Sequence, residues 1–202
     1  MAFDWLTGNN LPQFWKNYIS LFDNDDQKEQ KRYVIFDMET TGLDWKEDVI
    51  LSIGAIGVNG SAIAVGDFFE VVLQQDKFST QSVGLNAVIK ESAEKVVEAE
   101  AIIRFLNFAK DATLVGHNIN LDIEMLNQAL KRLDLGRIKN PVMDTNVLYQ
   151  RWKDLPNDTQ STLEEVCNAL KIRKNELHTA SGNAYITSLI FLKLKRKMKI
   201  QD

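Results

Sequence analysis

Cysteine is nearly absent from this sequence, which limits the chemistry open to the protein. Only Cys167 among the 202 residues is a cysteine. The chain therefore cannot form an internal disulfide or a zinc cluster built from cysteines. A single thiol fits a reducing compartment, and we expect the protein to lie in the cytoplasm.

Long apolar runs and an excess of basic residues are also missing. No segment approaches the roughly 20 apolar residues of a membrane span, and the opening MAFDWLTGNN has no features of a signal peptide. We therefore expect a soluble, unexported protein with no membrane partner. A net charge of −4 and a pI near 5.3 exclude binding of phosphates by overall basicity. Any contact with nucleic acid must be local.

The chain begins with an amphipathic segment and continues with a charged one. Residues 11–22 place an apolar face at helical spacing, made by Leu11, Phe14, Trp15, Tyr18, Ile19 and Phe22. This face either packs onto the rest of the protein or docks a partner protein. Residues 23–32 contain no apolar side chain and read as a linker. We expect a helix and linker over 1–32 and one compact domain over 33–202.

The remaining pattern predicts an α/β protein. Three strands come first and are followed by alternating helices and strands, which indicates a mixed sheet flanked by helices. No internal repeat interrupts this order. We expect strands at 33–38, 49–57, 68–73 and 113–117, helices at about 94–110, 120–133, 161–171 and 183–197, and an unassigned segment at 141–152.

The first strand ends in two acids that point to the same side. In YVIFDMETTGLD (33–44), alternation along the strand places Asp37 and Glu39 on one face. Acids there lose hydration unless a cation neutralises them, and a hard divalent cation with oxygen ligands does so. A bare pair of acids would be read as a solvated strand end. The whole string, however, resembles the first motif of the DEDD 3′→5′ exonuclease superfamily, which includes the proofreading epsilon subunit of bacterial DNA polymerase III.

The second motif of that family is an aspartate that opens a helix after a short strand. TLVGHNINLDIEML (113–126) resembles it, and Asp122 shares a helix face with apolar residues, so its carboxylate should lie on the inward side. The family usually has an aromatic residue just before this aspartate, where this chain has Leu121.

Two other segments match the family less completely. PVMDTNVL (141–148) resembles a segment between the second and third motifs, but Asp144 and Thr145 fit an Asx turn equally well. We assign them no catalytic role. In VGLNAVIKES (83–92), relatives commonly have an Ile-His-Gly-Ile-like string near the substrate, and this chain has Leu-Asn-Ala-Val instead.

The third motif keeps its histidine and lacks its carboxylate. In HTASGNAYITSLIFL (178–192), His178 stands where the family has its general base, and a pKa near neutrality suits proton removal from water. The expected aspartate is Asn183, and no Asp or Glu lies between His178 and Gln201. An amide removes a full negative charge, so metal affinity should fall at least by the roughly 10–100-fold typical of changes around a metal site.

The resemblance covers about residues 33–197 and implies a ribonuclease H-like fold with a mixed five-stranded sheet. It also implies two Mg²⁺ or Mn²⁺ ions, roughly 4 Å apart, held by Asp37, Glu39, Asp122 and residue 183. These ions would activate water and stabilise the leaving 3′ oxygen, with His178 as the base. By the same resemblance, the substrate contacts are Thr40, Thr41, Gly42, Leu43 and Asn118.

Several functions remain open on these grounds. The first is an exonuclease that releases nucleoside monophosphates from single-stranded ends, with DNA as the expected substrate and with reduced turnover. The second is an inactive nucleic-acid or protein-binding module on the same fold, and a third is a nuclease for short oligonucleotides or modified ends. No polymerase-docking tail is evident. The basic finish KLKRKMK (193–199) either holds phosphates or is simply a solvated helix end.

Overall fold

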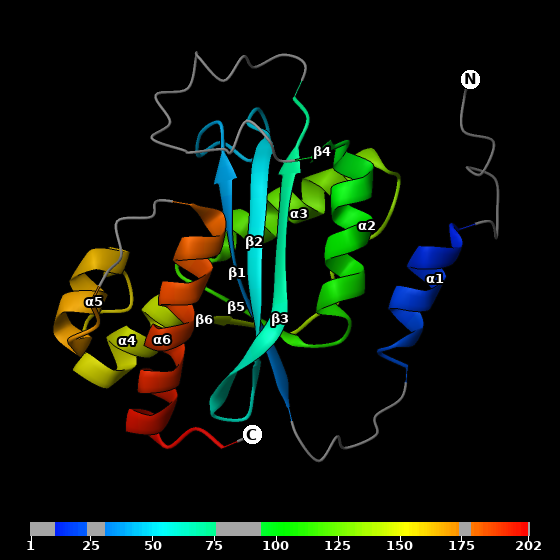
Figure 1. Ribbon diagram of the computed structural model, residues 1–202. Coiled ribbons are helices and arrows are strands. Elements are labelled where there is room, and N and C mark those ends of the chain that lie inside the picture. The colour runs from blue at the N-terminus through cyan, green and yellow to red at the C-terminus, as the bar shows by residue number, and fades with distance from the viewer. Residues whose placement is uncertain (1–10, 24–30, 76–93, 174–178, 202) are drawn as a thin grey trace.

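The computed structural model describes residues 11–23, 31–75, 94–173 and 179–201 (Figure 1). None of the helices within these ranges is both long and apolar enough to cross a lipid bilayer. The elements in chain order are α1 (Gln13–Ser20), β1 (Arg32–Thr40), β2 (Ile50–Asn59), β3 (Ala62–Leu73), β4 (Lys95–Val96), α2 (Glu98–Ala109), β5 (Thr113–Gly116), α3 (Asn120–Arg132), β6 (Val142–Asp144), α4 (Thr145–Lys153), α5 (Leu163–Leu170) and α6 (Ala180–Met198).

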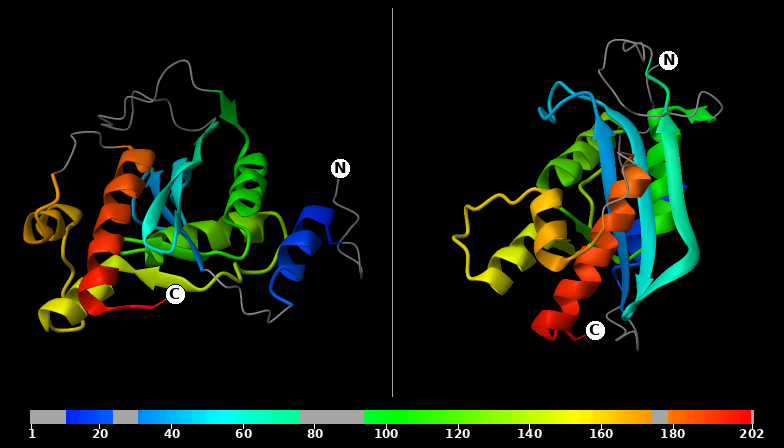
Figure 2. Two further views of the ribbon diagram at one scale, coloured as in Figure 1. Left: turned by 60° about the horizontal axis from the view of Figure 1, so that its bottom comes forward. Right: turned by 60° about the vertical axis from the view of Figure 1, so that its left-hand side comes forward.

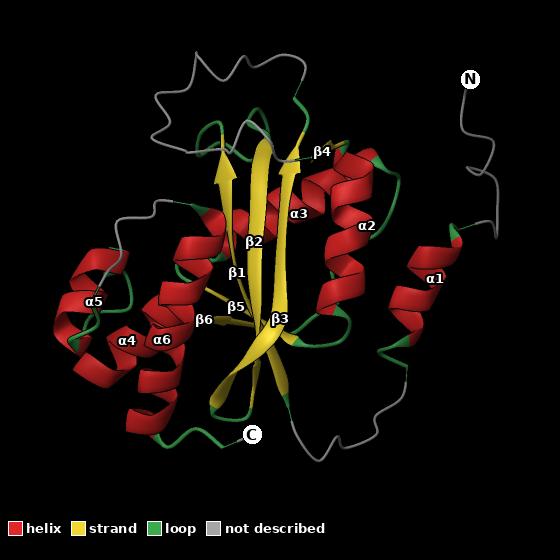
Figure 3. Ribbon diagram, viewed as in Figure 1, coloured by secondary structure: helices red, strands yellow, loops and turns green. Residues whose placement is uncertain are grey.

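A mixed sheet forms the centre of the molecule (Figure 3). Its strands run in the order β4-β3-β2-β1-β5-β6. β2 is antiparallel to β1 and to β3, whereas the pairs β1 and β5, β5 and β6, and β3 and β4 are parallel. The expected α/β architecture is confirmed, with six strands in the described ranges in place of the five expected.

Two elements differ from the expected ones for local reasons. β3 begins at Ala62, not at residue 68, because Asn59 pairs with Ala62 and closes a hairpin through Gly60, whose φ of 58° suits such a turn. The helix expected from residue 94 begins at Glu98, since Lys95 and the residue after it pair with the end of β3 as β4. A two-residue strand is too short to leave a periodic signal in the sequence.

Alternation along β1 separates the two sides of the core. Val34 and Phe36 join the cluster that is shared with α1, α2 and α3, while Tyr33 and Ile35 join the cluster that is shared with α4, α5 and α6. Figures 1 and 2 show these two groups of helices on opposite faces of the sheet. Asp37 follows Tyr33 and Ile35 on the same face of β1 and therefore faces α6.

Helix α1 packs onto the α2 and α3 side through its aromatic face. Trp15 and Tyr18 are buried, with 2% and 3% of their surface exposed. The Tyr18 hydroxyl donates a hydrogen bond to Asn140 Oδ1 at 2.7 Å and accepts one from the backbone N–H of Lys139 at 2.7 Å. The structure thus favours packing of this face on the protein itself over docking of a partner.

The attachment of α1 can be tested with Tyr18→Phe. The change leaves Oδ1 of the Asn140 side chain and the backbone N–H of Lys139 without the hydroxyl that they bind. The loss should lower the free energy of unfolding by about 1–3 kcal/mol. Urea denaturation measures this loss. Tyr185→Phe is the matched control, because Tyr185 is 43% exposed. Equal stability of the two variants would show that α1 is not held by this contact.

Candidate active site

Three elements bring the predicted ligands together at one end of the sheet. Asp37 lies near the end of β1, Asp122 in the first turn of α3 and Asn183 in the first turn of α6. The Asn183 side chain donates a hydrogen bond from Nδ2 to Asp37 Oδ2 at 3.2 Å. The charge of Asp37 in turn acts on Asp122. The structure therefore places these three residues in one group, as the motif order predicts.

The acids of this group repel one another and are only partly exposed to water. The pKa of Asp37 is raised to about 7, mainly by burial. The hydrogen bond from Asn183 lowers this pKa, and the charge of Glu39 raises it. Burial also raises the pKa of Asp122 well above its ordinary value, and the charge of Asp37 adds to the shift. No Lys or Arg in the described ranges forms an ion pair with any of these acids. Such a group binds either protons or a cation.

Gly54 allows α6 to reach the sheet beside Asp37. Gly54 lies opposite Asp37 in the pairing of β1 with β2. A Cβ atom at position 54 would lie only 2.2 Å from the backbone nitrogen of Ser181. Backbone therefore packs against backbone at this point, which is what brings Asn183 within hydrogen-bond reach of Asp37.

Asp144 holds the turn that precedes α3. Its carboxylate accepts hydrogen bonds from the backbone N–H groups of Asn118 at 3.0 Å, Ile119 at 3.2 Å and Asn146 at 2.7 Å. The last bond caps α4, as the Asx-turn alternative predicts. The other two hold the turn that leads into α3. Asp144 is thus a positioning residue for Asp122.

His117 has structural partners on both ring nitrogens. Nδ1 lies 2.9 Å from Thr145 Oγ1 and Nε2 lies 2.8 Å from the carbonyl oxygen of Ser161. Burial lowers the pKa of His117, so the neutral ring is favoured. The side-chain amide of Asn118, a predicted substrate contact, also donates to the Ser161 carbonyl oxygen, at 3.4 Å. These bonds tie the end of β5 to the segment before α5.

The loop after β1 uses most of its polar groups internally. Thr41 Oγ1 donates to Asp48 Oδ1 at 2.7 Å, and Thr40 Oγ1 donates to the Gly42 carbonyl oxygen at 2.6 Å. A Cβ atom at Gly42 would lie 2.4 Å from the Asp48 carboxylate, so only glycine allows this close approach. Leu43, in contrast, is 83% exposed. Of the four predicted contacts in this loop, Leu43 alone presents a large open surface.

One acid near the site was missed from the sequence. Glu70 Oε1 accepts a hydrogen bond from Ser181 Oγ at 2.7 Å, at the start of α6. Its charge raises the pKa of Glu39, after burial, which is the larger cause. A single acid inside the apolar strand FFEVVL is the feature of the sequence that could have indicated this residue. Sequence alone, however, does not say which strands lie near β1. His178 and the segment 83–92 lie outside the described residues.

The donor set has the chemistry that Mg²⁺ and Mn²⁺ prefer. Carboxylate oxygens are the usual ligands of such hard cations, and Asp37 and Asp122 form no ion pair with a basic side chain in the described ranges. Within the described ranges, however, no three acidic, histidine or cysteine side chains form a ready-made metal cluster. The oxygens fit a divalent cation, while the amide at Asn183 leaves less negative charge for a second one.

The buried acids predict an unusual dependence of stability on pH. Because the pKa of Asp37 is about 7 in the folded protein and 3.8 ordinarily, the folded state holds more protons than the unfolded state between these values. Stability of the metal-free protein should therefore fall as the pH rises from 4 to 7, and Asp37 alone should contribute a slope of up to about 1.4 kcal/mol per pH unit. Denaturation at a series of pH values in EDTA measures it.

Two variants sharpen this measurement. Asp37→Asn should make the decline less steep, leaving the part that is due to Asp122, and should be more stable than the parent above pH 7, because it removes a carboxyl that ionises at a desolvated position. Asp158→Asn, at an exposed position, serves as the control and should keep the parent profile. A parent profile without any decline toward pH 7 would contradict the burial of uncompensated acid.

Comparison with known proteins places this geometry in a family. The profile of the RNase T family, described as an exonuclease, matches residues 34–191. The PolC-type DNA polymerase III of Latilactobacillus sakei is 33% identical over 175 residues, which are 86% of this chain and 12% of that polymerase. For the Bacillus subtilis enzyme of the same name, the identity is 30% over 173 residues, with 82% and 12% covered. The chain thus spans about an eighth of the length of these relatives.

Solved structures share the fold. E. coli exonuclease I in complex with a dT13 oligonucleotide superposes with a TM-score of 0.66 at 14% identity, covering 84% of this chain and 42% of that one. Exonuclease X in complex with 5′ overhanging duplex DNA gives 0.60 at 18% identity, with 83% and 93% covered. The ribonuclease H-like fold is confirmed. Since the family profile includes all three motifs and most of the chain, this chain belongs to the exonuclease family of the DEDD type.

Proposed function

We propose that this protein is a metal-dependent 3′→5′ exonuclease that hydrolyses single-stranded nucleic-acid ends to nucleoside monophosphates, with strongly reduced turnover. DNA is the expected substrate, since the PolC-type relatives are DNA polymerases by name. The observation that carries the proposal is the meeting of Asp37, Asp122 and position 183 at one end of the sheet. Because the chain has a single cysteine, which fits a reducing compartment, we infer a cytoplasmic location.

The roles of the residues follow from their positions. Asp37, Glu39 and Asp122 would hold the divalent cations, with the side-chain oxygen of Asn183 as a weak fourth donor. Cations bound there would stabilise the negative charge that develops on the phosphodiester. His178 would accept the proton of the attacking water. Leu43 at the exposed loop tip would contact the terminal nucleotide, with Thr40, Thr41, Gly42 and Asn118 shaping the backbone around it.

The amide at position 183 acts on this site in two ways. It removes one of four negative charges, so two dications would no longer be balanced. Its Nδ2 also donates to Asp37 Oδ2, an oxygen that a cation would otherwise bind. Both effects lower metal affinity, and metal-dependent turnover falls with it.

That hydrogen bond also supports a second candidate function. An amide that bridges α6 to Asp37 partly satisfies the buried acid without any metal. The protein would then be an inactive nucleic-acid or protein-binding module that keeps the exonuclease fold.

Asn183→Asp separates the two candidates. The new carboxylate should raise the release of mononucleotides from the 3′ end by at least tenfold, because it restores the charge that the ions need. The measurement uses a 5′-labelled single-stranded DNA oligonucleotide in Mg²⁺ and in Mn²⁺, with product lengths read on a denaturing gel. The same assay on RNA reports the sugar preference.

Two variants control this experiment. Asn168→Asp adds the same charge at an exposed position of α5, and it should leave the parent rate unchanged. Asp122→Asn in the Asn183→Asp protein should abolish the gain. If the Asn183→Asp protein degrades neither DNA nor RNA, the exonuclease proposal is wrong and the binding module takes its place.

A further inference from the structure

Two cavities lie along the side of α6 that faces the β2–β3 hairpin. Gly182, Tyr185 and Ile186 line the first, and Lys193 and Arg196 are among the residues that line the second. Counted from Gly182, the other four positions follow at three, four, eleven and fourteen residues, so they share one face of the helix. The first cavity begins beside Asn183, and the second lies at the far end of α6.

The first cavity presents aromatic rings to solvent. It measures about 290 Å³, and Phe68 of β3 lines it from the sheet opposite Tyr185. Phe68 is 51% exposed and Tyr185 is 43% exposed, although large aromatic side chains are usually covered. Half-exposed rings beside a cavity suit the stacking of nucleic-acid bases, which does not depend on sequence.

The second cavity is strongly basic. It measures about 530 Å³, and Lys193, Lys195, Arg196 and Lys199 line it with no acid among the other described lining residues. Lys195 Nζ donates to the Gly60 carbonyl oxygen at 2.8 Å, which fixes this amine at the hairpin.

The cations at the mouth of this cavity have no ion-pair partner among the residues that the structure describes. The side chains of Arg196 and Lys199 are exposed, and neither forms an ion pair with any described residue. Arg32, Arg104 and Arg132, elsewhere in the protein, are each paired with an acid. In a chain of net charge −4, such a local concentration of positive charge favours a phosphate-bearing ligand.

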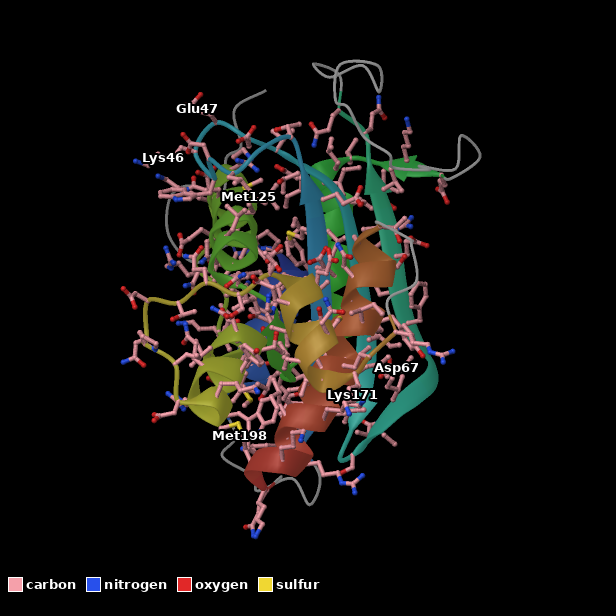
Figure 4. All side chains as sticks on the ribbon, turned by 90° about the vertical axis from the view of Figure 1, so that its left-hand side faces the viewer. Lys46, Glu47, Asp67, Met125, Lys171 and Met198 are labelled. Carbon is pink, nitrogen blue, oxygen red and sulfur yellow. The ribbon has the colours of Figure 1, made fainter. Side chains whose placement is uncertain are left out.

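The separation of the cavities sets the length of that ligand. Arg196 follows Asn183 by thirteen residues of helix, which corresponds to about 20 Å at 1.5 Å per residue. In Figure 4, Met198 near the end of α6 lies at the opposite end of the molecule from Glu47 of the loop after β1. A stacked strand that advances about 3.4 Å per nucleotide would need roughly six nucleotides to span this distance.

We infer that Phe68, Tyr185, Arg196 and Lys199 form a track that binds the single strand on the 5′ side of the end held in the active site. The bases stack on the two rings, and phosphates farther along the strand bind the two cations. The inference rests on the proposed exonuclease function, because the track starts at that site. It assigns phosphate binding to the basic end of α6.

Binding of oligothymidylates of different length tests the track. Fluorescence anisotropy in EDTA, where hydrolysis does not interfere, compares a 5′-labelled trimer with a 12-mer. The 12-mer should bind at least tenfold more tightly, since only it reaches the basic cavity. The double variant Arg196→Glu/Lys199→Glu should remove most of this difference. It should also reduce the slope of log K against log salt by about 1.4, the value for two lost phosphate contacts on a single strand.

Two further variants complete the design. Lys131→Glu/Lys139→Glu makes the same change in net charge at exposed positions outside the track, and it should leave the length dependence intact. Tyr185→Ala should weaken binding of the 12-mer about tenfold while leaving binding of labelled polyglutamate unchanged, because only bases stack on the ring.

The outcomes separate the track from the proposed function. Equal binding of trimer and 12-mer, or an Arg196→Glu/Lys199→Glu protein that matches the control, overturns the track even if nuclease activity is present. Loss of polyglutamate and oligonucleotide binding to the same extent in Tyr185→Ala also overturns it, since an acidic protein segment would then be the better ligand. Length-dependent binding without hydrolysis by the parent or Asn183→Asp protein keeps the track and rejects the exonuclease.

Discussion

Strand β1 is hydrogen-bonded on both of its edges, and the position of every group in the site depends on that pairing. β2 holds it on one side over nine residues and β5 on the other over three. A strand fixed in this way cannot slip by one residue without exchanging its two faces. The alternation that buries Tyr33 and Ile35 under α6 therefore also determines that Asp37 faces α6, where its carboxylate meets Asn183.

The chemistry of the site follows from how its charge is balanced. Asp37 and Asp122 are drawn close by β1 and α3, each raises the electrostatic cost of ionising the other, and no basic side chain in the described ranges offsets that cost. A protein that serves only as a scaffold gains nothing from this arrangement, because an apolar pair would pack there without the cost. The arrangement fits the cation site that we propose here. Asn183 offers the weaker compensation of a single neutral hydrogen bond.

Residues in local patterns were predictable from the sequence, while residues placed by distant contacts were not. Strand alternation and helix periodicity indicated the directions of Asp37 and Asp122, whereas position 183 was identified by the resemblance to the third family motif. Glu70 could not be predicted, since its approach to α6 depends on the order of strands in the sheet. The bond between Tyr18 and Asn140, 122 positions apart, is of the same kind. The hydrogen bonds of Thr41 and Asn118 within the protein could not be predicted for a different reason. A sequence motif identifies a hydroxyl or amide side chain but does not say whether it contacts a ligand or its own loop.

Gly54 determines how closely the first turn of α6 approaches the sheet. Its hydrogen atom is the only group that fits between β2 and the first turn of α6, and a methyl group there would push the helix outward and carry position 183 away from Asp37. The close packing at Gly54 therefore holds the side chain at position 183 against Asp37, and that side chain is an amide. Asn183→Asp would therefore supply a fourth carboxylate without altering the backbone, whereas a substitution at Gly54 would displace the helix itself.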